Sequence, residues 1–370
     1  VEPVIARVRE LAPAARLYAY GLYAPMNADW LRGLGVETTL GGEFEAGLVE
    51  LVEGRDARAG IERLDFVVPD RAGLPSLERY AALRVRGENK VAGYTEASRG
   101  CKHRCRHCPI VPVYDGVFRV VRREVVLEDI RRQVEAGAQH ITFGDPDFFN
   151  GTGHAIPLVR ALHARHPLLT YDVTIKIEHL LRHRDLLPIL RQTGCALVTS
   201  AAESIDDAVL ERLAKGHTRA DFFAAVRLMR EAGLALAPTF VTFTPWTSRQ
   251  GYRELLEAIS ELQLIDAVAP IQLAMRLLIP AGSRMLELED VRRLVGDFNP
   301  AKLAYPWRHP DPGVDELCAS LQTLIRREEP RGTSRTDIFA MIWKHAIGRP
   351  PDFGLVSRAA VPYLTEPWYC

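Results

Sequence analysis

Apolar residues recur along the chain with two alternating periods, one typical of buried strands and the other of amphipathic helices. Six short apolar segments predict strands, over residues 92–98, 139–143, 170–177, 196–201, 236–243 and 270–278. Helical patterns lie between and after them, over residues 127–136, 154–164, 187–192, 207–213, 220–232 and 251–262. Strands that alternate with helices predict a parallel sheet with right-handed crossovers. Six such units predict an α/β fold with a partial, open (β/α)6 barrel rather than a closed eight-fold one.

The first 75 residues show a second α/β pattern. Helices are expected over 3–11 and 28–34, with short strands over 16–20 and 36–40. This order is typical of part of a doubly wound, Rossmann-like domain whose opening strand is absent. Beyond residue 290 the chain is rich in proline and arginine, and one helix is predicted over 315–327. We therefore expect three parts, which are an incomplete Rossmann-like domain (1–75), the partial barrel (85–290) and a C-terminal extension (291–370).

Composition narrows the possible classes of function. Lys+Arg and Asp+Glu both number 47, and this balance argues against a general nucleic-acid binder. No apolar run approaches the roughly 20 residues of a membrane helix, and no signal segment opens the chain. Six cysteines in 370 residues do not form a disulfide framework, so we expect a cytoplasmic protein without a membrane partner.

Three of the cysteines lie within eight residues. Cys101, Cys105 and Cys108 have the spacing C-x3-C-x2-C and directly follow the first predicted barrel strand. Barrel active sites are built from the loops at this end of the strands. Three thiolates hold three irons of a four-iron cubane and leave the fourth iron open to an outside ligand. The alternatives are a zinc site, with His103 or His107 as fourth ligand, and three cysteines that are only packed in the core.

The cysteine motif resembles the signature of the radical S-adenosylmethionine (SAM) superfamily. The resemblance implies a [4Fe-4S] cluster that cleaves SAM reductively and an electron donor such as a flavodoxin or ferredoxin. Family members usually carry an aromatic residue before the last cysteine, and His107, which stands there, is expected near the adenine. Gly144 and Asp145 follow the second strand and resemble the segment that receives the methionine ammonium. An ordinary Asp-Pro turn is the alternative.

Other strand ends supply further candidates. Glu203 and Ser204 follow the fourth strand, where the family often binds ribose hydroxyls, and a helix cap is the alternative. Arg276, in the sixth predicted strand, is expected to face either the SAM carboxylate or the rim of the core. Lys176 and Glu178 follow the third strand and suit a catalytic role in a substrate pocket, with a surface ion pair as the alternative.

The whole chain is similar to radical SAM proteins that carry a cobalamin-binding-like N-terminal domain and a tail with paired cysteine or selenocysteine (the CUAEP/CCAEP group). The matching stretches are 19–25, 41–47, 174–181 and 364–370. That group resembles the radical SAM enzymes of arsinothricin biosynthesis. The resemblance implies transfer of the 3-amino-3-carboxypropyl group of SAM to trivalent arsenic, with Cys370 as a soft ligand for arsenite. It also makes cobalamin a candidate cofactor.

Three alternatives to that function stay open. The chain is a cobalamin-dependent radical SAM methyltransferase in the first, and a non-catalytic iron–sulfur or zinc protein in the second. In the third, Cys370 is a frayed terminal thiol without a role. A small-molecule substrate is expected under both catalytic hypotheses.

Overall fold

The computed structural model describes residues 1–57, 63–85, 87–351 and 361–365, and the chain divides into two compact units. One unit contains Phe66–Arg99, Val120–Leu277 and Arg308–Cys370 and is called the barrel unit here. The other contains Val1–Asp65, Gly100–Arg119 and Leu278–Trp307 and is called the loop unit. The cysteine motif therefore belongs to the same compact unit as the N-terminal segment.

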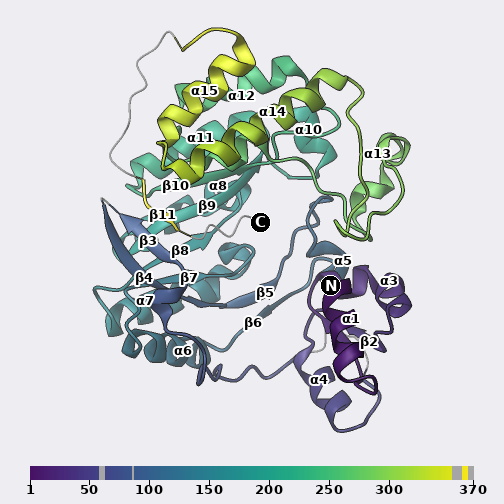
Figure 1. The fold of residues 1–370 in the computed structure, drawn as a ribbon. Helices are drawn as coiled ribbons and strands as arrows, with labels where there is room; N and C mark the ends of the chain where they lie inside the picture. The colour runs from purple at the N-terminus through teal and green to yellow at the C-terminus, as the bar shows by residue number, and fades with distance from the viewer. Residues whose placement is uncertain (58–62, 86, 352–360, 366–370) are drawn as a thin grey trace. The chain divides into compact units, whose positions relative to one another are not determined.

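The barrel unit is built on a seven-stranded sheet with the order β10-β9-β8-β7-β4-β3-β11 (Figure 1). Five of its strands pair in parallel, namely β4 (Glu88–Thr95), β7 (His140–Phe143), β8 (Thr170–Thr174), β9 (Cys195–Glu203) and β10 (Leu236–Phe240). At one edge, β3 (Ala82–Val85) runs antiparallel to β4, and β11 (Tyr363–Leu364) runs antiparallel to β3. The predicted partial α/β barrel is confirmed.

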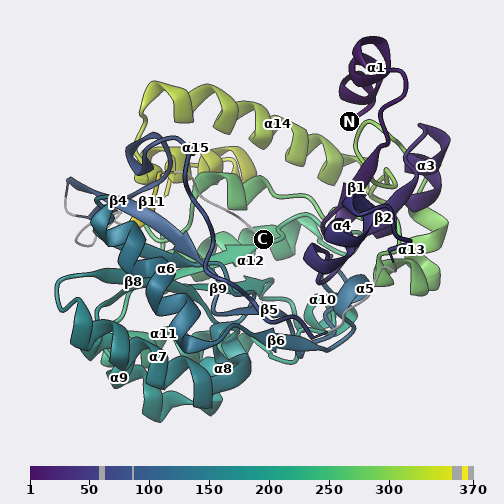
Figure 2. The same cartoon turned by 90° about the horizontal axis from the view of Figure 1, so that it is seen from below.

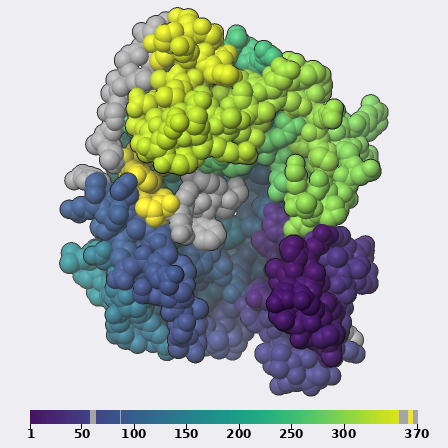
Figure 3. Space-filling model, in the orientation of Figure 1, coloured from purple at the N-terminus to yellow at the C-terminus, as the bar shows by residue number. Residues whose placement is uncertain are grey.

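Helices cover one side of this sheet (Figure 2). They are α6 (Arg123–Glu135), α7 (Thr152–Arg165), α8 (Ile177–Arg182), α9 (Leu187–Gln192), α10 (Asp207–Arg212) and α11 (Arg219–Glu231). Further along the chain come α12 (Arg249–Glu261), α14 (Pro312–Glu328) and α15 (Arg335–Ile347), of which α14 and α15 form part of the outer surface of the barrel unit (Figure 3). The predicted helices are found at these places, while α8, α15, β3 and β11 were not predicted.

Side chains alternate between the two faces of the strands. Tyr171 and Val173 are fully buried in the apolar core with the helices. Asp172 lies between them and points to the other face, because successive residues of a strand alternate. There its carboxylate accepts from Thr142 Oγ1 at 2.7 Å and lies 2.8 Å from Nε2 of His140. The inner face of the curled sheet is therefore polar.

The prediction of a sixth strand over 270–278 is wrong for its first half. Residues Pro270–Ala274 form the 3-10 helix η4, and only an isolated parallel bridge joins Phe243 to Arg276 further on. Pro270 has no N–H for a ladder, which favours a helical start. In place of a strand, the side chain of Gln272 accepts from the backbone N–H of Phe240 at 2.8 Å.

The loop unit contains two parallel strands, β1 (Tyr18–Tyr20) and β2 (Thr38–Leu40). Around them lie α1 (Glu2–Leu11), α2 (Tyr23–Met26), α3 (Ala28–Gly33) and α4 (Glu45–Val52). The unit also contains α5 (Val111–Tyr114) after the cysteines, and η5 (Arg284–Glu287) and α13 (Glu289–Leu294) in its third segment. Ala24, Leu31 and Val36 form a small core of its own. None of the helices in the described ranges is long and apolar enough to cross a bilayer.

Candidate active site

The cysteine loop lies between β5 (Ser98–Gly100) and β6 (Phe118–Val120), which pair in a short two-stranded sheet. Cys101 and Cys105 are buried and Cys108 is half-buried. Within the loop, the N–H of Cys108 donates to the carbonyl of Cys105 at 3.2 Å. Three soft thiolates on one short loop, two of them shielded from water, fit an iron–sulfur cluster by the chemistry of the donor set.

Two basic residues of the loop have partners close by. The ammonium of Lys102 lies 4.8 Å from the centre of the Phe118 ring, and the guanidinium of Arg104 lies 3.0 Å from a carboxylate oxygen of Asp115. Lys102 and Arg104 stand beside the cysteines along the chain, and Asp115 balances the charge of Arg104.

The turn after β7 holds the segment that leads into the cysteine loop. Asp145 accepts from the backbone N–H of Ala97 at 2.8 Å and from the Ser98 hydroxyl at 2.5 Å. Burial raises the pKa of Asp145 to about 7, against the opposing effect of these bonds. Next to it, a Cβ on Gly144 would overlap the hydroxyl of Tyr94. Both oxygens of Asp145 already accept bonds from the protein, and its role as an acceptor for the methionine ammonium stays a prediction.

A buried ion pair stands at the end of β9. The Lys215 ammonium lies 3.3 Å from Oε1 of Glu203, and both side chains are buried. Glu203 itself has φ +63, a left-handed conformation that costs energy in a residue with a side chain. Nearby, Nε2 of His217 donates to the carbonyl of Ala202 at 3.2 Å. Burial, and next the charge of Lys215, lowers the pKa of His217 to about 4.

The structure brings the predicted pocket residues Lys176 and Glu178 together at the end of β8. The Lys176 ammonium is buried and lies 3.7 Å from Oε2 of Glu178, whose other oxygen accepts from Arg182 at 2.5 Å. A Cβ on Gly216 would lie 3.1 Å from Oε2 of Glu178. Glu178 thus touches the loop that carries Lys215, and the ends of β8 and β9 form one polar cluster.

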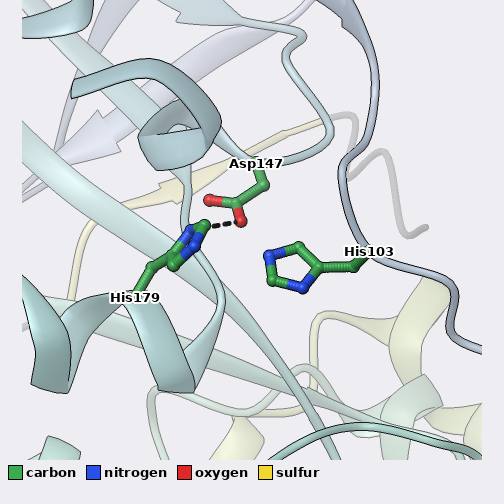
Figure 4. Close-up of side chains that lie close together, drawn as sticks. All are labelled: His103, Asp147 and His179. Carbon is green, nitrogen blue, oxygen red and sulfur yellow. Dashed lines mark ion pairs between the residues drawn. The ribbon is translucent and has the colours of Figure 1, made fainter. Parts of the chain in front are cut away.

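A further acidic–basic pair was not predicted as a site. Nδ1 of His179 lies 2.7 Å from Oδ2 of Asp147, and both side chains are buried (Figure 4). Asp147 caps the 3-10 helix η2 (Phe148–Gly151) by accepting from the N–H of Phe149. Both residues stand in polar segments directly after strands, which is the signal in the sequence that points to them.

The remaining predicted residues have other neighbours. Ser204 accepts from the N–H of Asp206, and it is Asp206 rather than Ser204 that caps α10. Arg276 donates to Asp315 of α14 at 2.6 Å, at the rim of the core. His107 is half-buried in the cysteine loop, and Cys370 lies outside the described residues.

Comparison with known proteins shows similarity to radical SAM proteins. Residues 95–260 match the model of the Radical SAM superfamily. The chain is 24% identical over 241 residues to the hopanoid C-3 methylase of Methylococcus capsulatus, covering 61% of this chain and 45% of that protein. It is 27% identical over 213 residues to the tRNA-2-methylthio-N(6)-dimethylallyladenosine synthase of Desulfosudis oleivorans, covering 55% and 45%. The chain thus spans about half the length of these relatives.

Two solved structures share the fold. The cobalamin-dependent S-adenosylmethionine radical enzyme OxsB superimposes with a TM-score of 0.70 at 15% identity, over 88% of this chain and 56% of that chain. The radical SAM methyltransferase TsrM of Kitasatospora setae gives a TM-score of 0.60 at 20% identity, over 78% and 60%.

Residues 95–260 thus match the Radical SAM superfamily, and the partial α/β barrel agrees with that match. The match and the relatives indicate an enzyme, and radical SAM enzymes use a [4Fe-4S] cluster and SAM.

Proposed function

We propose that this chain is the radical SAM part of a cobalamin-dependent methyltransferase, with its cluster on Cys101, Cys105 and Cys108. The observation that carries the proposal is the cysteine loop, where three thiolates on one short segment follow the first parallel strand. When bound, such a cluster supplies the electron that breaks a carbon–sulfur bond of SAM. The similar solved structures OxsB and TsrM and the hopanoid methylase relative support methyl transfer as the overall reaction.

The polar cluster of the barrel unit provides the groups that would bind and orient SAM and substrate. The Glu203 carboxylate suits ribose hydroxyls, and Lys215 holds that carboxylate in place. Asp145 holds Ala97 and Ser98, which precede the cysteine loop. Lys176 and Glu178 present an ammonium and a carboxylate at the adjacent strand end, and Asp147 orients the imidazole of His179 for proton transfer.

The inner face of the sheet favours a polar small-molecule substrate. Thr142, Thr174 and Thr199 are partly exposed, and their alternation along β7, β8 and β9 places them on the same face as Asp172. Thr142 and Asp172 already bind each other, and the hydroxyls of Thr174 and Thr199 suit hydrogen-bonding groups of a substrate. An electron donor such as a flavodoxin or ferredoxin completes the proposed reaction.

The two parallel strands of the loop unit support cobalamin as a cofactor. In doubly wound domains, ligands bind beyond the carboxyl ends of the strands, and β1 and β2 end at Gly21 and Gly41. A Cβ on Gly21 would meet nothing within 4 Å, whereas one on Gly41 would overlap Pro25. The described residues of this unit supply two parallel strands for the proposed cobalamin cradle.

Transfer of the 3-amino-3-carboxypropyl group to arsenite, with Cys370 as the arsenic ligand, stays a prediction from the sequence. The relatives favour methyl transfer over it. The two reactions differ in the fragment of SAM that remains, so a single assay distinguishes them.

The experiment is anaerobic incubation of the reconstituted protein with SAM and dithionite, with and without added cobalamin and arsenite, followed by mass spectrometry. Methyl transfer leaves S-adenosylhomocysteine together with 5′-deoxyadenosine, and aminocarboxypropyl transfer leaves methylthioadenosine. Cys105→Ala should abolish cleavage, while Cys195→Ala, at a buried core position outside the motif, should retain it. SAM that stays intact with the wild-type protein and its cluster would contradict the proposal.

A further inference from the structure

Tyr114 closes the cysteine loop of the loop unit. It is the last residue of α5, and the first residue of that helix, Val111, donates its N–H to the carbonyl of Cys108 at 3.3 Å. The Tyr114 ring also lies against Gly100, the residue before Cys101. A Cβ on Gly100 would come within 2.5 Å of the ring, and the positive φ of +74 there also favours glycine. One buried side chain thus links the entrance of the loop to its exit.

The hydroxyl of Tyr114 reaches the N-terminal segment of the same unit. It donates to Oε1 of Glu43 at 3.3 Å, and each of the two side chains is only 5% exposed. Glu43 stands in the glycine turn after β2. A Cβ on Gly41 would overlap Pro25 and lie 3.4 Å from Val113 of α5. The glycine turn therefore packs directly on the helix that follows the third cysteine.

We propose that Tyr114 and Glu43 are a positioning pair, which fixes the geometry of the three cysteines and couples the N-terminal segment to the cluster. The proposal rests on the assignment of the cluster made above. The bond is long for an O–H···O pair, but both groups are buried and water does not compete for them, so it favours one position of the Tyr114 ring on Gly100. The Glu43 carboxylate thereby helps to position the cysteine loop through Tyr114.

The test compares the reconstituted wild-type protein with Tyr114→Phe, Glu43→Ala and Glu43→Gln. Tyr20→Phe, at a 59% exposed tyrosine of the same unit, is the matched control. The readouts are the rate of iron transfer to a chelator and the electron paramagnetic resonance spectrum of the reduced cluster, with and without SAM. An ordinary buried hydrogen bond changes an equilibrium by about fivefold, so we expect Tyr114→Phe and Glu43→Ala to lose iron about fivefold faster. They should also change the spectral response to SAM.

Rescue and non-additivity separate a specific pair from general destabilisation. Glu43→Gln keeps an acceptor for the hydroxyl and should stay within about twofold of the wild type. Tyr114→Phe combined with Glu43→Ala should be no worse than either change alone, because both remove the same bond. Iron release and spectra of Tyr114→Phe that equal those of the wild type overturn the pair alone. A wild-type protein that takes up no iron overturns the cluster assignment, and the pair with it.

Discussion

Replacing Asp145 with asparagine tests how the segment before the cysteine loop is held. The buried carboxylate accepts from Ala97 N–H and Ser98 Oγ. An asparagine oxygen can accept from Ala97, and its amide can donate to Ser98 if the hydroxyl turns to accept. The substitution therefore keeps the shape and removes the ionisation. Any difference between the two proteins that depends on pH then reports the burial of this one charge.

The magnitude follows from the raised pKa of Asp145, about 7 against an ordinary value of 3.8. The folded state holds the proton more tightly than the unfolded chain, so the contribution of Asp145 to stability is fully present below pH 4. It is lost as the pH rises through 7. Between pH 5 and pH 8, the stability of the wild type relative to Asp145→Asn should fall by about 2.5 kcal/mol, as an order-of-magnitude value.

The assay is urea unfolding of both proteins without cluster, at pH 5, 6.5 and 8. Asp185→Asn, at an exposed position of the same unit, is the control and should track the wild type at each pH. A difference in the free energy of unfolding between the wild type and Asp145→Asn that stays constant over this range would refute the reasoning. It would mean that the two donors, rather than burial, decide the charge state of Asp145.

Three other changes test the polar cluster and the turn after β7. Lys215→Met leaves the Glu203 carboxylate buried without the ammonium that faces it. The free energy of unfolding in urea should fall by about 3–5 kcal/mol. Adding Glu203→Gln to the same chain should restore most of that loss. Gly144→Ala should lower the melting temperature, because the added Cβ overlaps the Tyr94 hydroxyl. Adding Tyr94→Ala should restore the melting temperature. A double variant that stays as unstable as Gly144→Ala would mean that the overlap with Tyr94 is not the cause. The pKa of His217 is lowered to about 4, so the unfolded chain takes up a proton before the folded one does. As the pH falls from 7 to 4, the free energy of unfolding of the wild type should therefore fall by up to about 3 kcal/mol relative to His217→Gln. A difference between the two proteins that does not change with pH would contradict this.

The parallel core of the fold could be predicted from the sequence because its signals are local. Strands β7, β8 and β9 are short apolar segments followed by helices with amphipathic periods, and each of these patterns is complete within its own stretch of chain. The cysteine motif is local in the same sense, since all three ligands lie on one loop. The strands β3 and β11 gave no such signal, because a strand of two to four residues gains its stability from its neighbours.

The partners within the site follow from packing over long separations in sequence, and spacing alone does not contain them. Glu203 meets Lys215 because the chain returns after α10, and Asp147 meets His179 because parallel strands bring their carboxyl ends to one edge. The same reason applies to Glu43 and Tyr114, which are 71 residues apart. In the sequence, the two glycines before Glu43 are compatible with a ligand cradle. In the fold, Gly41 provides room for Pro25 and Val113, and the carboxylate that follows binds a tyrosine of the cysteine loop. A glycine in the sequence therefore indicates that another group packs closely on the backbone there. Only the packing of the fold shows whether that group is a cofactor or another part of the protein.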